Sequence, residues 1–372
     1  MAKKIIVKDK KPKKIISDQA YAFLKEYINN PSPTGFEYPG QKLWLEYIKP
    51  YADTYFTDPY GSAVAVINPT ASFKVVIEAH ADEISWFVNY ISPEGLIYVK
   101  RNGGVDHQIA PGKRVIIHGK KGNVKAVFGW PAIHTRMGAD KEPQPKVDNL
   151  TLDCGARNKK EVEELGITIG SVATYQEGYD ELAHGYLIGR AFDNRIGGFM
   201  IAEVARLLKT NNKKLPFGLY IVNAVQEEIG LRGAEMMARR IKPDIAIITD
   251  VTHDTTTPML NKFIEGETAC GKGPSLTFGP AVHNKLLAIV QDTAKKHNIP
   301  VQLHTVSRST GTDTDSFAYA NDGCPSVLIS IPLRYMHTTV EMLHKDDIEN
   351  TVRLMYETLL TLTPKTNLSY FS

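Results

Sequence analysis

The stretch FKVVIEAHADEI, residues 73–84, decides the fold. Its centre is a continuous apolar run rather than an alternation of apolar and polar residues. A continuous run is typical of a strand that is buried on both faces in a parallel sheet. The run ends in a polar loop that contains His80 and Asp82. A strand buried on both faces needs helices above and below it, so this stretch predicts an α/β sheet.

The segments on either side of this strand repeat the same pattern. Apolar, strand-like runs recur at residues 217–225, 244–251 and 324–332. Helical patterns lie between them and before them, at residues 17–29, 42–52, 194–209, 232–241, 283–298 and 346–362. Residues 30–41 are rich in Pro and Gly and are expected to form a loop. Alternating helices and strands predict a doubly wound mixed α/β sheet with helices on both faces.

The region from residue 87 to residue 183 has a different texture. Short strand-like runs alternate there with glycine turns, as in GLIYVKRNGG and GKRVIIHGKKGNVKAVFGW. Closely spaced short strands are typical of a small barrel or sandwich. We therefore expect an inserted small β-barrel domain at 87–183, an α/β domain at 17–86 and 184–372, and a basic tail at 1–16.

Charge and cysteine content exclude several classes of protein. The chain of 372 residues has a net charge of +3, but its first fourteen residues hold seven Lys and one Asp, which leaves a net charge of −3 for the rest. A Lys-rich end of this kind is usually solvated, although it can contact nucleic acid or anionic lipid. No stretch approaches the length of a membrane span. The three cysteines are odd in number and widely spaced, so we expect no disulfide framework and a cytoplasmic location.

Polar residues follow the predicted strands at the points where each strand ends. In open α/β sheets the carboxyl ends of the strands form the ligand-binding edge. A single acidic residue at such a place is more often a helix cap than a ligand. Together, two histidines and several carboxylates make a set that suits Zn²⁺ or Co²⁺, and Mn²⁺ less well. The residues of this set are His80, Asp82, Asp193, Glu227, Glu228, Asp250 and His337.

The number of these residues is sufficient for two metal ions. If Asp193 bridges two metals, His80 and Asp250 complete the ligands of one. Glu228 and His337 then complete the ligands of the other. Each metal would have three protein ligands and an open position for water, which indicates a catalytic site rather than a structural one.

The adjacent glutamates and Asp82 receive different roles. Side chains two residues apart point the same way in extended chain, so Asp82 can orient the His80 imidazole. Neighbouring side chains point opposite ways, so Glu228 can face a metal while Glu227 faces the attacking water as a general base. The alternative interpretation of the Glu227–Glu228 pair is a solvated turn.

Several motifs resemble a known family in sequence and in order. They are EAHADEIS, GRAFDNRIGG, VQEEIGLRGA, ITDVTH, GTDTDSFA and ISIPLRYMHTTVEM. They resemble the dinuclear metallo-aminopeptidases that include glutamyl, deblocking and self-compartmentalising tetrahedral (TET-type) aminopeptidases, some of which carry an endoglucanase name. The resemblance covers residues 18–363, including the insert. Two features depart from it: Thr338-Thr339 stands where many members have Ser-Pro, and the basic tail is longer.

The resemblance implies a fold, a metal site and an assembly. It implies the same five metal ligands, with Glu227 as the general base. It also implies that the barrel serves assembly and that the chain is a homo-oligomer, as many members are dodecamers. The endoglucanase activity finds little support, because acetal cleavage typically uses two free carboxylates.

Three further residues are candidates for contacting the substrate. His253 lies three residues after Asp250, Arg334 lies three residues before His337, and Asp313 lies in a loop rich in Gly, Ser and Thr. Each has a plain structural alternative. His253 can be a loop histidine, Arg334 can be a surface residue, and Asp313 or Asp315 can cap a helix.

The sequence thus predicts an enzyme of a stated class. We expect a cytoplasmic metallo-aminopeptidase that binds two divalent ions, Zn or Co, and removes N-terminal residues from peptides, with no nucleic-acid or membrane partner. A deacylase, deblocking enzyme or carboxypeptidase would use the same metals on a blocked substrate. A non-catalytic scaffold recruited by the Lys-rich tail is the remote alternative, because it leaves the ligand set unexplained.

Overall fold

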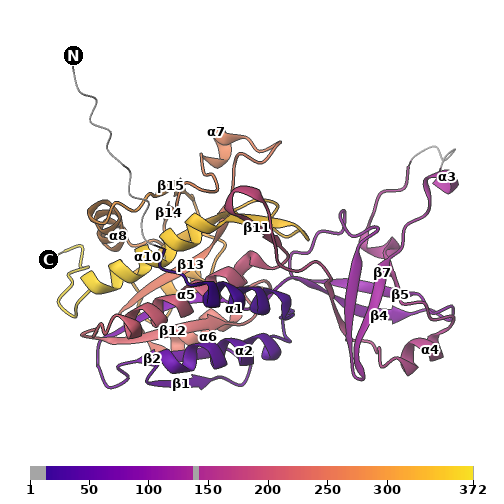
Figure 1. Cartoon of the computed structure of the whole chain (residues 1–372), viewed down its shortest axis with the longest axis horizontal. Coiled ribbons are helices and arrows are strands. Elements are labelled where there is room, and N and C mark those ends of the chain that lie inside the picture. The colour runs from indigo at the N-terminus through magenta and orange to yellow at the C-terminus, as the bar shows by residue number, and fades with distance from the viewer. Residues whose placement is uncertain (1–13, 137–141, 372) are drawn as a thin grey trace, which may run out of the picture.

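The computed structural model describes residues 14–136 and 142–371 as an α/β unit joined to a separate barrel (Figure 1). Residues 1–13 of the basic tail predicted at 1–16 lie outside the described residues. The principal helices are α1 (Asp18–Asn29), α2 (Tyr38–Ile48), α5 (Phe192–Thr210), α6 (Arg232–Ile241), α8 (Asn284–Lys296) and α10 (Lys345–Thr361), and the short ones are α3 (Ile133–Arg136), α4 (Lys159–Glu164), α7 (Lys262–Glu265) and α9 (Thr314–Ala318).

The α/β unit is built on an eight-stranded mixed sheet. Its order is β1-β2-β12-β3-β13-β16-β14-β15. The strands are β1 (Thr54–Thr57), β2 (Ala63–Ile67), β3 (Lys74–His80), β12 (Gly218–Ala224), β13 (Ile245–His253), β14 (Ser275–Phe278), β15 (Gln302–Thr305) and β16 (Ser326–Leu333). The four central strands, β12, β3, β13 and β16, are parallel. The predicted doubly wound mixed sheet is confirmed.

The central strands are apolar because helices cover both faces of the sheet. Every residue of β16 is buried, as are all but the first residue of β3. On one face α5 packs against β3 and β13, and α1, α2 and α10 pack against α5. On the other face α6 and α9 contact the strands and each other. The continuous apolar runs in the sequence therefore reflect burial from both sides.

The second helix begins earlier than its sequence pattern indicated. Residues 38–41 were expected to belong to a loop, but α2 starts at Tyr38 and takes Pro39 into its first turn. Proline is compatible with that position because the first amide groups of a helix have no partner within it. Gly40 is required there, because a Cβ would lie 2.9 Å from the Ser32 hydroxyl.

The insert is a closed six-stranded barrel. Its strands are β4 (Ser85–Ile91), β5 (Ile97–Asn102), β6 (Arg114–Gly119), β7 (Gly122–Phe128), β8 (Thr151–Asp153) and β9 (Val172–Tyr175), in the order β4-β5-β8-β7-β6-β9. It has an apolar core of its own, separate from that of the α/β unit. The predicted barrel is confirmed as a fold, whereas the domain limits 87 and 183 stay predictions.

The chain returns from the barrel through a small sheet. Strands β10 (Asp180–Glu181), β11 (Tyr186–Gly189) and β17 (Glu341–His344) pair in the order β10-β11-β17. This sheet brings the segment before α5 against the segment that follows β16. It therefore places Asp193 close to His337.

A buried cluster of charged side chains lies at the junction between the two units. The Glu83 carboxylate, two residues before β4, lies 3.0 Å from the Arg190 guanidinium and 3.8 Å from that of Arg195. It also accepts a 2.7 Å hydrogen bond from the Ser32 backbone amide. The Arg195 guanidinium is fully buried and stacks over the Tyr27 ring. Glu83 is therefore the carboxylate that balances two buried cations at the point where the barrel begins.

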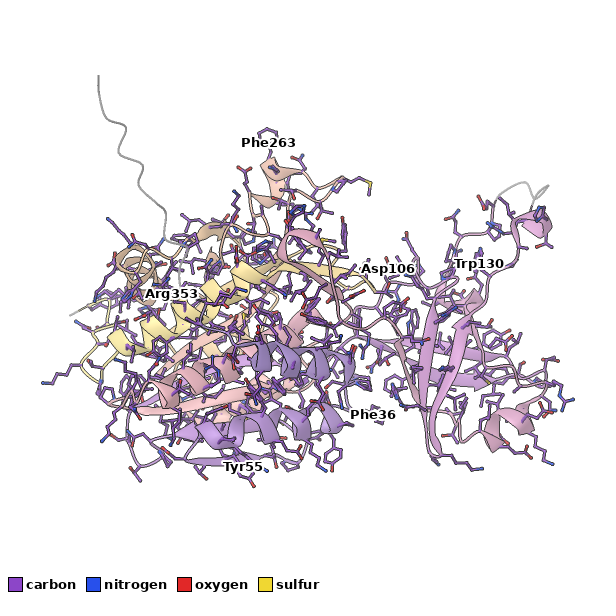
Figure 2. The ribbon with its side chains drawn as sticks, viewed as in Figure 1. Phe36, Tyr55, Asp106, Trp130, Phe263 and Arg353 are labelled. Atoms are coloured by element: carbon purple, nitrogen blue, oxygen red, sulfur yellow. The ribbon has the colours of Figure 1, made fainter. Side chains whose placement is uncertain are left out.

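A long loop between β13 and β14 projects from the α/β unit. It carries the short helix α7, and Figure 2 shows Phe263 at its tip, far from the barrel. Met259 and Phe263 are fully exposed. Within the described residues, no helix combines the length and apolar character that crossing a membrane requires.

Candidate functional site

The four parallel strands end at one edge, and the predicted polar residues meet there. Residues Ala224 of β12 and His80 of β3 are register partners, and Asp250 of β13 pairs with Ser330 of β16. Glu227 and Glu228 follow β12 by three and four residues, and His337 follows β16 by four. Because these strands are adjacent in the sheet, residues that are far apart in the chain become neighbours.

One group of donors surrounds His80. The Nε2 atom of His80 lies 3.2 Å from Oδ1 of Asp193 and 3.8 Å from Oδ1 of Asp250. These three side chains each place a donor atom within 4.8 Å of the others, which is an arrangement that can hold a metal ion. All three side chains are buried.

A second group of donors surrounds His337. Its Nε2 atom lies 3.3 Å from Oδ2 of Asp193 and 3.5 Å from Oε2 of Glu228. These three side chains also satisfy the distances of a possible metal site. Asp193 directs one oxygen to each histidine, and among the described residues it alone belongs to both of these groups. The role of Asp193 as a bridging ligand stays a prediction.

Glu227 belongs to a third possible group of donors, which it forms with His80 and Glu228. Its Oε2 atom is 3.8 Å from Nε2 of His80, and its side chain is mostly buried. It lines the same cavity as Asp193, Glu228 and Asp250. Glu227 therefore faces the same cavity as the donor groups.

Asp82 supports the cluster in two ways. Its Oδ1 atom lies 3.3 Å from Nδ1 of His80, as the spacing of the two residues predicted. It also accepts hydrogen bonds from the backbone amides of Glu227, at 2.9 Å, and Glu228, at 3.2 Å. The Thr34 hydroxyl donates a further hydrogen bond, at 2.8 Å. One buried carboxylate thus orients both an imidazole and the adjacent glutamates.

Glu341 is a residue that the sequence analysis missed. It is buried on β17, and its two carboxylate oxygens accept hydrogen bonds from the backbone amides of Asp193, at 3.0 Å, and His337, at 2.9 Å. It therefore sets the spacing between two residues of the cluster. A signal was available, because Glu341 is the penultimate residue of the motif LRYMHTTVEM, four residues after His337.

The pKa values of the cluster reflect the burial of several carboxylates close to two histidines. Burial raises the pKa of Asp250 to about 7 and that of Glu227 to about 9. The pKa of Asp193 is lowered despite its burial, because both histidines hydrogen-bond to it. Burial lowers the pKa of His337, but the hydrogen bond to the Asp193 carboxylate raises it. The net effect raises the pKa of His337 to about 10.

Buried carboxylates cost free energy unless a cation compensates them. Imidazole and carboxylate donors together are the set that Zn²⁺ and Co²⁺ prefer. The residues present therefore fit divalent metal ions in both their chemistry and their spacing.

The cluster opens into a cavity of about 590 Å³ between the sheet edge and the segment from His304 to Asp315. His253, one of the three predicted substrate contacts, lies on its wall. The structure does not bring the other two to the described lining. The Arg334 guanidinium is bound to Asp254, at 2.8 Å, and Thr256, at 2.9 Å. Asp313 is fully buried against Glu78 of β3, below the cavity floor.

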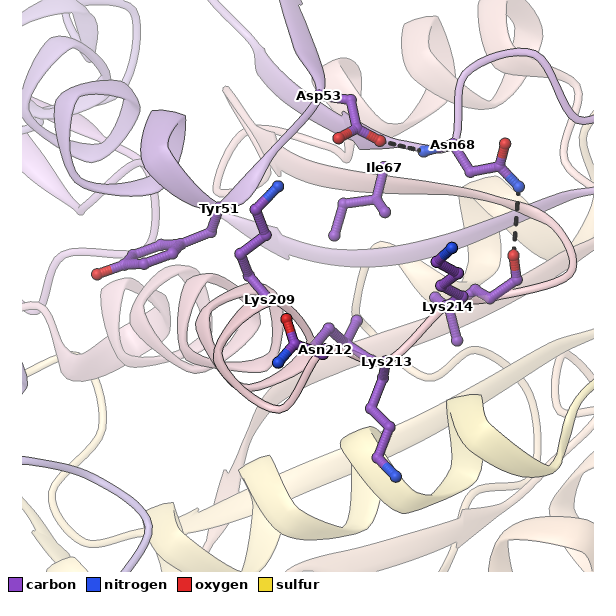
Figure 3. Close-up of a pocket in the computed structure, with 10 residues that line it drawn as sticks. Tyr51, Asp53, Ile67, Asn68, Lys209, Asn212, Lys213 and Lys214 are labelled. Carbon is purple, nitrogen blue, oxygen red and sulfur yellow. Dashed lines mark hydrogen bonds between the residues drawn. The ribbon is translucent and has the colours of Figure 1, made fainter.

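A second cavity, of about 450 Å³, lies near the end of α5 (Figure 3). It is lined by Lys209, Lys213 and Lys214, but Figure 3 shows Lys213 directed away from the other two. Among the described lining residues Asp53 is the only carboxylate, and it already accepts a 2.8 Å hydrogen bond from the Asn68 backbone amide. The described lining contains no histidine and no cluster of acidic groups, so the carboxylate and histidine cluster is the better candidate for a catalytic site.

The fold and this cluster place the chain among aminopeptidases. The structure of a TET aminopeptidase from a marine sediment archaeon of the Thaumarchaeota superposes with a TM-score of 0.89 at 30% identity, over 94% of this chain and 98% of that one. The Pyrococcus horikoshii TET1 peptidase, described as able to assemble into a tetrahedron or a large octahedral shell, superposes with a TM-score of 0.82 at 26% identity, over 92% of this chain and 100% of that one.

The family follows from the sequence comparisons. The lysyl aminopeptidase of Pyrococcus furiosus is 32% identical over 347 residues, which is 92% of this chain and 98% of the relative. The model of the M42 glutamyl aminopeptidase family matches residues 61–354. The chain belongs to this family, and it is therefore a peptidase, as the sequence motifs predicted.

Proposed function

We propose that this chain is a dinuclear metal-dependent aminopeptidase. The observation that carries the proposal is the shared residue Asp193, whose two oxygens face the two histidines of separate donor groups. In this proposal one metal ion is held by His80, Asp193 and Asp250. The other is held by Asp193, Glu228 and His337. Zn²⁺ or Co²⁺ fits these donors best.

The reaction follows from the placement of the cluster's residues. Bound divalent ions would supply Lewis acidity for the scissile carbonyl and would lower the pKa of the attacking water. Glu227 takes the proton of that water and passes it to the departing amine. Asp82 holds the imidazole of His80 and the backbone of Glu227 in place. Glu341 does the same for the backbone of Asp193 and His337.

We infer further that the substrate is a peptide with a free N-terminal amine. The relatives named above are aminopeptidases, and the cavity ends at a floor of carboxylates that suits an ammonium group as well as metal ions. Homo-oligomeric assembly as a dodecamer is proposed by analogy with the PhTET1 structure, which is described as a dodecamer. The cytoplasm is proposed as its location, because the three cysteines are free.

The test is the hydrolysis of one short peptide in two forms, free and N-acetylated, by metal-reconstituted and chelator-treated protein. The expected result is cleavage of the first peptide bond of the free form alone, lost on chelation and restored by Zn²⁺ or Co²⁺. Cleavage of the acetylated form would instead support a deblocking or deacylating hydrolase. Cleavage that persists after complete removal of metal would contradict the two-metal site.

A further inference from the structure

The cavity above the metal cluster has two chemically different regions. Its floor is the donor cluster, where the amine and the scissile carbonyl of a peptide would bind. Its wall is formed by short polar side chains and two histidines from the ends of β13 and β15 and from the loop before α9. The wall residues are Thr252, His253, His304, Ser309, Thr310, Thr312 and Asp315.

Asp315 is the only carboxylate in this wall among the described residues. It is half-buried in the first turn of α9. Both of its oxygens accept hydrogen bonds from the Thr310 backbone amide, at 3.0 and 3.1 Å, and one of them accepts from Gly311, at 3.3 Å. These bonds shape the loop, and their donors are neutral backbone amides.

No cation in the described wall opposes this charge. Among the described residues that line the cavity there is neither Lys nor Arg. Burial lowers the pKa of His304, so its imidazole is uncharged at neutral pH. Three arginines lie nearby but outside the lining. Arg308 is exposed and directly precedes Ser309 of the wall. Arg334 is bound to Asp254, and the Arg232 guanidinium lies next to Gly230.

The position of Asp315 bears on the first residue of the substrate. If the α-amine and the first carbonyl occupy the floor, the side chain of the N-terminal residue has to lie against a wall of the same cavity. An acidic side chain there would face Asp315 with no partner, whereas a basic one would gain a partner. Like charges brought together in a partly desolvated cavity repel strongly.

We propose that Asp315 makes this cavity select peptides that begin with a basic residue, accept neutral ones and reject acidic ones. The proposal rests on the aminopeptidase function proposed above. It separates this chain from the glutamyl specificity in the name of its family. The cavity volume of about 590 Å³ leaves room for a lysine side chain.

The experiment compares three substrates that differ in the charge of one residue. They are the p-nitroanilides of lysine, glutamine and glutamate, measured as kcat/KM with the metal-loaded protein. Calorimetric binding of the free amino acids gives a second readout that requires no turnover. The variants are Asp315→Asn, which removes the charge, and Asp315→Glu, which retains it. Asp322→Asn, on the exposed turn after α9, is the matched control.

The expected order is lysine, then glutamine, then glutamate, with lysine favoured over glutamate by at least about tenfold, as a nearby like charge requires. Asp315→Asn should reduce that ratio by about tenfold or more. Asp315→Glu and the control should keep the wild-type order.

Two results would overturn the proposal. Glutamate cleaved as well as lysine by the wild-type protein would contradict the charge argument, and so would an unchanged ratio in a folded Asp315→Asn variant. Failure to cleave any of the three substrates and any free peptide would contradict the aminopeptidase function itself. The wild-type comparison and the Asp315→Glu variant remain decisive if Asp315→Asn does not fold.

Discussion

Glu341 and Asp82 show how the site is held at the scale of single residues. Neither points an oxygen at the open cavity. Each accepts two backbone N–H groups next to the proposed metal ligands, and Asp82 also contacts His80. Carboxylates in such positions fix the ligands before any metal arrives, which is the arrangement that metal sites need for rapid and specific binding.

The proposed general base gives a prediction at this scale. Glu227→Gln should lower kcat by about 10²–10⁴-fold, because the amide cannot accept the proton of the attacking water. Metal content, measured by elemental analysis, should stay at the wild-type value, because Glu227 is not among the five proposed ligands. An unchanged kcat would show that another group takes the proton.

The residues that sequence reasoning placed well are those that follow strand ends. The parallel order of β12, β3, β13 and β16 carries His80, Glu227, Glu228 and Asp250 to one edge, whatever the loops do. Arg334 and Asp313 depended on loop paths instead. Arg334 turns to Asp254, and Asp313 turns inward to Glu78, which spacing along the chain does not reveal.

Helices and central strands followed from the sequence because their burial repeats with a clear period. Helix α10 was expected at 346–362 and runs from Lys345 to Thr361. The edge strands β1 and β15, and β14 beside β15, were not expected, because each has only four residues and β1 and β15 are largely exposed. An edge strand is defined by its neighbour rather than by an apolar run of its own.

The ion cluster at the barrel junction gives a prediction at the scale of elements. Glu83→Gln should lower the free energy of unfolding by about 3 kcal/mol, because the fully buried Arg195 guanidinium would lose its balancing charge. The measurement is urea denaturation at neutral pH. Glu94→Gln, at the exposed turn between β4 and β5, removes the same charge and should change stability by less than about 0.5 kcal/mol. Equal effects of the two variants would contradict the role given to Glu83.

The whole molecule is expected to depend on metal for its stability. Ions that bind only the folded chain stabilise it by about 2.7 kcal/mol when present at a hundred times their Kd. Chelator-treated protein should therefore have a lower Tm than the reconstituted protein, because the buried carboxylates then repel one another uncompensated. Asp193→Asn is the control, since the loss of the shared residue should largely abolish the difference in Tm. A Tm that does not respond to metal in the wild-type protein would argue against a site in this cluster.

The two-unit architecture was predictable at this scale, but the contact between the units was not. The change from long apolar runs to short strands indicated an insert. Nothing in that pattern of short strands indicated that the segment after β5 would return to the edge of the eight-stranded sheet. The cavity is nevertheless lined by Gly104 from that segment, together with residues of the α/β unit.

Gly104 decides whether the barrel is an independent module. Its carbonyl oxygen lies 3.2 Å from Nδ1 of His337, and a Cβ at this position would lie 2.7 Å from the same atom. Only glycine lets the backbone approach the His337 imidazole so closely. The barrel therefore cannot be replaced by that of a distant relative without disturbing its contact with His337. The graft would also replace the carbonyl that orients a histidine of the site, so the two halves of the chain have to be inherited, and engineered, together.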